Sequence, residues 1–218
     1  MTSPGYETRT ETVSACGDDL QLRSLLDLQQ YDDPEGLAAL AGISTECWPL
    51  FGVVWPSARV LAHQMVTYSL SGQRILEVGC GLALASLVLH RRAGDVTASD
   101  CHPLVPLFLS RNLLLNAMGV MPYRCANWAR GDATLGRFDL IIGSDVLYER
   151  GHAGELSRFL DAHVEADGRV MLVDPNRSQR TQFSRDMEGF GFGLKWSAIE
   201  AAPGLDARYR GRLLNYAR

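Results

Sequence analysis

The chain has 218 residues, of which 46% are hydrophobic and 21% charged, and its formal net charge is −4. This length is enough for one well-buried α/β domain and short for two. The composition is that of an ordinary globular protein, and the acidic balance provides no polybasic surface for long nucleic acid. No apolar run approaches the roughly 20 residues of a membrane-spanning helix. We therefore expect neither nucleic acid nor a membrane as a partner.

The number and spacing of the cysteines indicate the kind of cellular compartment in which the protein works. The chain has five cysteines and no C-x-x-C pair: Cys16, Cys47, Cys80, Cys101 and Cys125. An odd count without metal-ligand spacing disfavours a disulfide framework or a zinc site and favours a reducing environment. The opening letters MTSPGYETRTET lack the apolar core of a signal peptide. We expect a cytoplasmic protein without a bound metal, whose cysteines are small buried side chains.

The first 50 residues predict an extension ahead of the main domain, which we place at residues 51–218. Residues 11–28 alternate apolar and polar side chains around the letters GDD, a pattern typical of a β-hairpin. An aromatic and proline-rich passage follows at 46–65. From Pro56 its apolar residues recur at helical spacing, and proline suits a first helical position.

From residue 74 onward, short apolar strands alternate with helical stretches. The expected parallel strands are 74–78, 95–100, 138–145 and 168–174, with a weaker one at 121–128. The expected helices are 82–92, 103–118, 152–165 and 178–190. Two closing strands, 193–201 and 211–218, have no helix between them and should pair antiparallel. This order predicts a doubly wound, Rossmann-like α/β sheet that is mostly parallel.

A glycine turn joins the first of these strands to its helix, in the letters ILEVGCGLALAS at 75–86. Gly79 and Gly81 allow a tight turn and the close approach of a ligand, and the helix that follows offers free N–H groups. Asp100 ends the next strand, where a carboxylate can accept hydrogen bonds from ribose hydroxyls. The glycines and Asp100 together predict a nucleoside site, whereas the glycines alone would fit a merely close-packed turn.

The nucleoside is not expected to be a dinucleotide. A dinucleotide fingerprint needs a third glycine at the position that Leu84 occupies. Glu77 precedes the turn by two residues, and an acid there suits a ligand with a cationic amino-acid portion better than a diphosphate. A nicotinamide-dependent oxidoreductase is therefore the disfavoured alternative.

These residues resemble a known family. Glu77, Gly79 and Gly81 followed by Asp100 are similar to the first two motifs of the seven-stranded S-adenosylmethionine-dependent methyltransferases. The chain departs from many members at Ala83, where they carry a third glycine.

Two further segments narrow the resemblance to a subgroup. The letters SDVLYE at 144–149 resemble a D-x-x-Y motif, and FGVVWP at 51–56 resembles a G-x-x-W-P segment. Both are typical of small protein N-methyltransferases related to the lysine methyltransferases of the electron-transfer flavoprotein β-subunit. The resemblance extends over roughly residues 45–218 and includes the closing strand pair.

The resemblance implies S-adenosylmethionine as the cofactor. Asn127 and Trp128 match the adenine-contacting position at the end of a strand, and Trp55 would lie over the methionine portion or, alternatively, pack in the core. The implied cofactor-binding residues are Trp55, Glu77, Gly79, Cys80, Gly81, Asp100, Asn127, Trp128 and Ser144.

Asp145 and Tyr148 are the predicted catalytic residues. Asp145 can orient an amine or accept its proton, and Tyr148 follows about one helical turn later. Asp145 could instead be a helix N-cap. Asn176 and Arg177 lie on the substrate side by topology, and Glu149 reads as a surface charge.

The sequence thus predicts methyl transfer to a nitrogen nucleophile, with a protein lysine as the acceptor. A small amine or heterocycle as acceptor, or a non-catalytic cofactor-binding module, are the alternatives. Nothing in the sequence bears on the oligomeric state.

Overall fold

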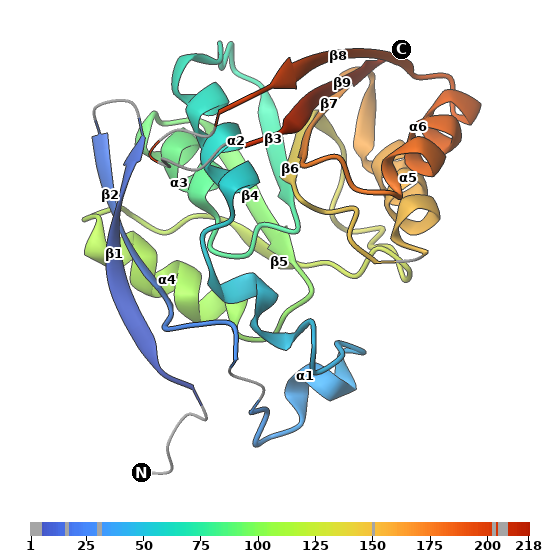
Figure 1. Cartoon of the computed structure of the whole chain (residues 1–218). Helices are drawn as coiled ribbons and strands as arrows, with labels where there is room; N and C mark the ends of the chain where they lie inside the picture. Colours follow the sequence, from blue (N-terminus) through green and yellow to red (C-terminus); the bar gives the residue numbers. More distant parts are fainter. Residues whose placement is uncertain (1–5, 16–17, 30–31, 150, 202–203, 205–208) are drawn as a thin grey trace.

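The computed structural model describes residues 6–15, 18–29, 32–149, 151–201, 204 and 209–218. A seven-stranded sheet crosses the molecule and a two-stranded hairpin lies beside it (Figure 1). The strands of the large sheet are β3 (Arg74–Val78), β4 (Asp95–Asp100), β5 (Tyr123–Cys125), β6 (Phe138–Ser144), β7 (Val164–Asp174), β8 (Gly193–Ile199) and β9 (Gly211–Ala217). The helices are α1 (Leu37–Leu40), the 3-10 helix η1 (Trp48–Gly52), α2 (Pro56–Thr67), α3 (Leu84–Arg91), α4 (Val105–Leu115), α5 (His152–His163) and α6 (Arg180–Gly189).

The strand order is β5-β4-β3-β6-β7-β9-β8. Strand β3 pairs in parallel with both β4 and β6, so the chain reverses its direction of winding between β3 and β6. Strand β9 pairs antiparallel with β7 and β8, as expected for the closing pair. The predicted fold class is confirmed, and ligands of such sheets bind at the carboxyl ends of the strands beside this reversal.

Each face of the sheet has its own hydrophobic core. Successive side chains of a strand point to opposite faces, so Ile75 packs with α2, α3 and α4 while Leu76 packs with α5 and α6. Both side chains are fully buried. Helices therefore cover both faces, which is the doubly wound arrangement.

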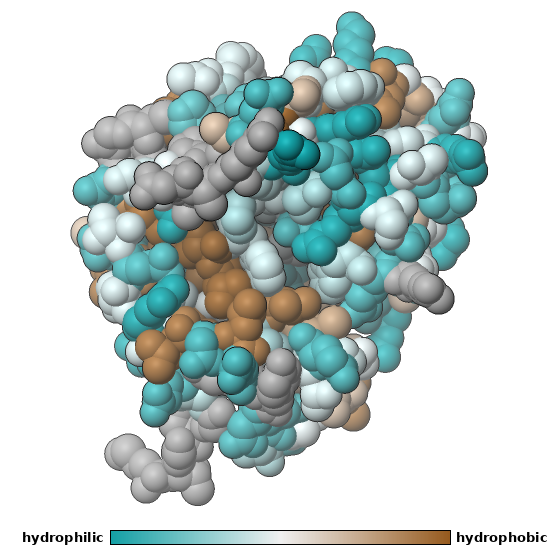
Figure 2. Space-filling model, viewed as in Figure 1, coloured by the Kyte–Doolittle hydropathy of each residue, from teal (hydrophilic) through white to brown (hydrophobic). Residues whose placement is uncertain are grey.

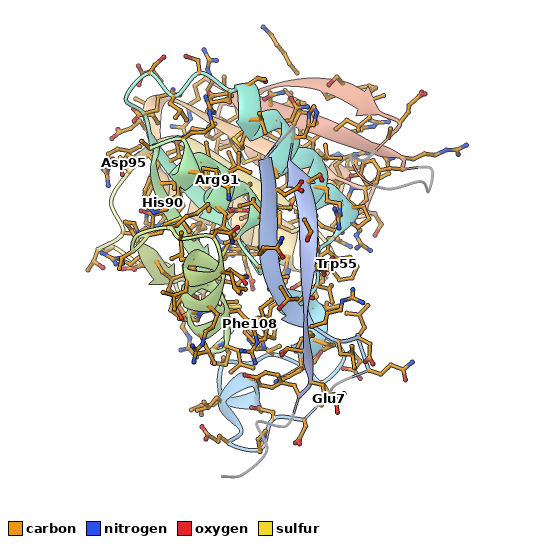
Figure 3. The ribbon with its side chains drawn as sticks, turned by 90° about the vertical axis from the view of Figure 1, so that its left-hand side faces the viewer. Glu7, Trp55, His90, Arg91, Asp95 and Phe108 are labelled. Atoms are coloured by element: carbon orange, nitrogen blue, oxygen red, sulfur yellow. The ribbon has the colours of Figure 1, made fainter. Side chains whose placement is uncertain are left out.

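The N-terminal hairpin consists of β1 (Thr8–Ala15) and β2 (Asp18–Leu25), paired antiparallel. It begins earlier than the sequence pattern indicated. Of the letters GDD at the predicted turn, residue 17 lies outside the described residues, and Asp18 and Asp19 belong to β2. Leu20 and Leu22 of β2 are buried in the core that contains α4. Figure 3 shows the hairpin in front of the main sheet, with Phe108 of α4 and Trp55 on opposite sides of it.

Several predicted boundaries are corrected. Strand β5 is an edge strand of only three residues, so Asn127 and Trp128 lie in the turn after it rather than at its end. Short edge strands are common because they limit pairing with other chains. Helix α5 ends at His163, because Val164 already belongs to β7. Within the described part of the chain, no helix has both the length and the apolar character to cross a bilayer.

Candidate active site

The turn after β3 has an unusual backbone. Gly79, Gly81 and Ala83 have φ angles of 58°, 51° and 58°, all in the left-handed region. Glycine adopts this region freely, whereas an alanine there costs about 1–2 kcal/mol. Ala83 is the N-cap of α3, so the turn brings the chain directly to the start of that helix. The tight turn expected from the glycines is confirmed.

Asp100 contacts this turn from the tip of β4. Its Oδ2 accepts a hydrogen bond from the Gly81 N–H at 2.9 Å, and its Oδ1 accepts one from the His102 N–H at 2.9 Å. The side chain is partly exposed. Burial raises the pKa of Asp100, although the two N–H donors act in the opposite direction. The structure thus brings two predicted cofactor residues into direct contact, with carboxylate lone pairs left for further donors.

Glu77, in the strand before the turn, is bonded to the helix that follows it. Its Oε2 accepts hydrogen bonds from the Ser86 N–H at 2.8 Å and the Ser86 hydroxyl at 2.5 Å, on helix α3. The residue is only 3% exposed, and burial raises its pKa to about 7. Glu77 therefore ties the strand to the helix beneath the turn, and its role in binding a cofactor stays a prediction.

Cys80 contributes mainly backbone to the turn. Its N–H donates to the Ser99 carbonyl at 2.9 Å, and its side chain is buried. Burial raises the pKa of the thiol well above its ordinary value, so the sulfur stays protonated.

An aromatic segment covers the other side of the turn. Phe51 of η1 stacks on His102 with ring centroids 3.9 Å apart. His102 is buried, and burial lowers its pKa to about 4. Trp55 is half-buried, and its indole N–H donates to the Leu50 carbonyl at 2.8 Å. Hydrophobic side chains gather in Figure 2 in the part of the view that η1 occupies in Figure 1.

Asn127 and Trp128 lie near the same turn. The Asn127 Oδ1 accepts a hydrogen bond from the Ala129 N–H at 3.0 Å, so this side chain shapes its own loop. The Trp128 ring lies close to Gly79, since a Cβ built there would be 3.5 Å from it. Ser144 is half-buried at the end of β6. The adenine contacts expected of Asn127 and Trp128 stay predictions.

The segment after β6 differs from the sequence expectation. Residues 145–149 are irregular, and the next helix, α5, begins at His152 with Gly151 as its N-cap. The one-turn helical relation between Asp145 and Tyr148 is therefore wrong, and Asp145 is not a helix N-cap. Asp145 has a φ of 56°, a left-handed conformation that aspartate tolerates better than most residues.

Asp145 and Tyr148 differ in exposure and in partners. The Arg177 Nε donates to the Asp145 Oδ1 at 2.7 Å, and the Asp145 side chain is only 9% exposed. Tyr148 is 42% exposed and meets His152 edge to face, with ring centroids 5.3 Å apart. Arg177, which the sequence placed on the substrate side, is thus the direct partner of the predicted catalytic carboxylate.

Sequence reasoning missed three contacts. Glu149 is not a simple surface charge, because its Oε1 accepts from the Cys47 thiol at 2.6 Å and its Oε2 pairs with His152 Nε2 at 3.0 Å. Asp174, the last residue of β7, accepts a hydrogen bond from the Arg177 N–H at 3.0 Å. The Glu149–His152 and Asp174–Arg177 contacts each join residues three positions apart, whereas the Cys47–Glu149 contact joins distant parts of the chain and could not be read from spacing.

The residues present suit a nucleoside with a sulfonium amino-acid portion. A turn with two glycines, the start of α3 and a partly exposed carboxylate meet at the strand reversal, and aromatic side chains border them. Asp100 has free lone pairs for ribose hydroxyls, and Gly79 and Gly81 leave backbone accessible. Among the described residues, no three His, Cys, Asp or Glu side chains are grouped to hold a metal ion.

The fold is that of the S-adenosylmethionine-dependent methyltransferases. Magnesium protoporphyrin IX methyltransferase from Synechocystis PCC 6803, solved with bound S-adenosylmethionine, superposes with a TM-score of 0.55 at 20% identity, over 73% of this chain and 76% of that one. Residues 47–189 match the family described as lysine methyltransferase, a span of well over half the chain. The chain therefore belongs to the lysine methyltransferase family.

Two relatives illustrate the family. The mouse electron transfer flavoprotein beta subunit lysine methyltransferase is 25% identical over 135 residues, which are 60% of this chain and 52% of that protein. Protein N-lysine methyltransferase METTL21A of Xenopus tropicalis is 28% identical over 149 residues, which are 64% of this chain and 66% of that protein. The chain thus spans about half the length of the mouse relative that it matches.

Proposed function

We propose that this protein transfers a methyl group from S-adenosylmethionine to a lysine side-chain nitrogen of a protein substrate, and that residues 51–218 form the catalytic domain. The observation that carries the proposal is the contact of Asp100 with Gly81 at the strand reversal. That contact lies beside the strand end that bears Asp145, within the fold and family described above. Both named relatives are lysine methyltransferases, which supports lysine as the acceptor.

The cofactor is assigned to the carboxyl edge of β3, β4 and β6. Asp100 would accept hydrogen bonds from the ribose hydroxyls, Asn127 and Trp128 would contact the adenine, and Trp55 would cover the methionine portion. The backbone of the glycine turn, with Cys80, holds the amino-acid end. Glu77 acts beneath the turn by fixing it to α3, and Ser144 borders the site from β6.

S-adenosylmethionine would supply a methyl group on a sulfonium: in-line attack by a neutral amine on the methyl carbon would form the C–N bond, break the C–S bond and release S-adenosylhomocysteine. The protein has only to hold a neutral amine against that methyl and exclude competing geometries. A lysine with an ordinary pKa near ~10.4 must lose a proton first, which a nearby carboxylate can accept. Asp145 and Tyr148, on the irregular segment after β6, are the residues assigned to this acceptor side.

The test is transfer of labelled methyl from S-adenosylmethionine into a cell lysate, followed by amino-acid analysis of the labelled protein. Methyllysine in one or a few proteins is the expected result. Asp145→Asn and Tyr148→Phe should slow transfer while leaving the affinity for S-adenosylhomocysteine nearly unchanged. If these substitutions abolish cofactor binding instead, Asp145 and Tyr148 belong to the cofactor site and their assignment to the acceptor side is wrong.

The same assay separates the alternatives. Label found only in small molecules would replace the protein substrate with a small amine. Cofactor binding with no transfer to any acceptor would indicate a binding module, and tight binding of a nicotinamide dinucleotide alone would refute the proposal. A cytoplasmic location is part of the proposal and is checked by fractionation of the source cells.

A further inference from the structure

Two carboxylates and one guanidinium lie together at neighbouring strand ends. Asp145 follows β6 and Asp174 ends β7, and the Asp145 N–H donates to the Val173 carbonyl at 2.9 Å, which fixes the two strand ends side by side. Arg177 contacts both acids: its Nε donates to Asp145 Oδ1 at 2.7 Å and its backbone N–H donates to Asp174 Oδ1 at 3.0 Å. The three residues form one unit, which we call the carboxylate pair with its arginine.

One buried oxygen of this unit, Asp174 Oδ2, has no partner among the described residues. Asp174 is only 2% exposed, and its Oδ2 has no hydrogen bond to any described residue. A buried carboxylate oxygen without a donor is costly, so such a group calls for an explanation. The bond from the Arg177 N–H accounts for Oδ1 alone. A purely structural turn would leave Oδ2 unexplained.

The neighbouring donors are engaged elsewhere. The Arg180 guanidinium donates to Asn176 Oδ1, and the Arg212 guanidinium lies over the Trp196 ring at 4.0 Å. The Tyr209 hydroxyl shares a hydrogen bond with Ser57 at 2.9 Å. None of these bonds goes to Asp174 Oδ2, which has no hydrogen-bond partner among the described residues, although the Asn176 backbone N–H and the Arg180 charge lower the pKa of Asp174.

The charge balance favours a cation. The carboxylate pair with its arginine contains two negative charges and one positive, and Arg177 is committed to Asp145. The remaining negative charge resides on Asp174, whose pKa burial raises while the charge of Arg180 acts against that rise. An ammonium group presents both the charge and the N–H donors that Asp174 Oδ2 lacks.

We infer that Asp174 binds the ammonium of the acceptor through its free Oδ2, and that the site thereby selects a cationic amine over a neutral nitrogen. This inference rests on the proposed function, since it assigns the substrate end of the same site. Arg177 is a positioning residue here: it keeps Asp145 paired and holds Asp174 through its backbone N–H. Asp145 and Asp174 are thus not equivalent, because the Arg177 guanidinium pairs with Asp145, whereas Asp174 receives the Arg177 backbone N–H and keeps a buried oxygen without a hydrogen bond to any described residue.

The test needs no knowledge of the natural acceptor. Sinefungin is an analogue of S-adenosylmethionine with a primary amine in place of the methyl group, so it presents an ammonium where the methyl would be. S-adenosylhomocysteine lacks that cation. The ratio of their dissociation constants, measured by calorimetry, reports the charge of the acceptor side and cancels any general change in the cofactor pocket.

Asp174→Asn should weaken sinefungin binding by about tenfold or more while S-adenosylhomocysteine binding changes less than about twofold, because the substitution removes one charge-assisted bond. Arg177→Gln should act in the opposite direction and strengthen sinefungin binding by about threefold or more, because it removes the competing cation. The matched control is Asp167→Asn, an exposed position in the first half of the same strand, which should change neither constant.

The possible outcomes distinguish a failure of this inference from a failure of the proposed function. An unchanged ratio in Asp174→Asn, or an equal loss for both ligands, overturns the inference and leaves the proposed function intact. Weaker sinefungin binding in Arg177→Gln also overturns it, because Arg177 would then support rather than compete with the cation. A wild-type protein that binds neither ligand overturns the proposed function itself. If Asp174→Asn fails to fold, the sign of the Arg177→Gln effect still decides.

Discussion

Gly81 and Phe51 approach so closely that no other residue type fits at Gly81. A Cβ built on Gly81 would lie 2.9 Å from the Phe51 carbonyl oxygen, a distance that real Cβ atoms do not show. The glycine also has a φ of 51°. The turn that precedes α3 is thus closed on one side by the backbone of η1, and Asp100 holds the same glycine through its N–H.

Gly81→Ala should therefore lower the free energy of unfolding by about 1–3 kcal/mol, because left-handed strain adds to displacement of a backbone carbonyl. S-adenosylhomocysteine binding should weaken as well, since the turn must shift. Urea denaturation and calorimetry measure the two effects. Gly119→Ala is the matched control, because nothing lies within 4 Å of its Cβ position. A Gly81→Ala protein as stable as the control would mean that η1 does not close this turn.

The raised pKa of Glu77 predicts that the stability of the fold depends on pH. Burial raises its pKa in the folded state to about 7 from an ordinary 4.5, so the folded protein binds a proton that the unfolded chain has released between these values. The free energy of unfolding should then fall as the pH rises from about 4.5 to about 7, by an amount on the order of 2–3 kcal/mol at most.

Glu77→Gln removes this titration and keeps an acceptor for the Ser86 donors. Relative to wild type, the variant should gain stability at about pH 8 and show little difference at about pH 4, where both states of the wild type are protonated. Urea denaturation across this range measures the difference, with Glu188→Gln, an exposed acid on α6, as the control. Parallel curves for wild type and Glu77→Gln would show that Glu77 does not control this region of the pH profile.

Much of the fold follows from local patterns, whereas the contacts of the acceptor side do not. The strands at 74–78 and 95–100 were bounded correctly because short apolar runs end there at glycine and aspartate. The letters SD before a helical stretch left a helix cap as the alternative role of Asp145, but residues 145–149 are irregular, Asp145 has a left-handed backbone, and its carboxylate pairs with Arg177. That pair depends on the order of the strand ends in space, which spacing along the chain does not encode.

The N-terminal hairpin is bonded to the core by asparagine side chains, which pair with the backbone of β2 as a neighbouring strand would. The Asn116 Oδ1 accepts from the Gln21 N–H at 2.9 Å and its amide donates to the Gln21 carbonyl at 2.8 Å. Asn112 pairs with Arg23 in the same way, at 2.7 and 3.4 Å. Asn112 of α4 and Asn116, the C-cap of that helix, therefore satisfy the outer edge of β2.

Asn116→Ala should lower the free energy of unfolding by about 1–3 kcal/mol, because it leaves a backbone N–H and C=O of β2 without partners. Hydrogen exchange should accelerate at the Gln21 amide and less at the Arg23 amide, which Asn112 still holds. Ser110→Ala, at an exposed position of α4, is the control and should change neither. Unchanged protection at Gln21 would show that the hairpin is held by its buried leucines alone.

Asp100 is the residue on which cofactor binding should depend most. Asp100→Asn keeps an oxygen for the Gly81 N–H but removes the charge that strengthens bonds from ribose hydroxyls. We expect the dissociation constant of S-adenosylhomocysteine to rise by about tenfold or more, the effect of weakening bonds to a charged group. Asp95→Asn, at the exposed opposite end of β4, is the matched control and should bind as wild type does. An unchanged constant in Asp100→Asn would place the ribose elsewhere, since the carboxylate would then serve only to hold the turn.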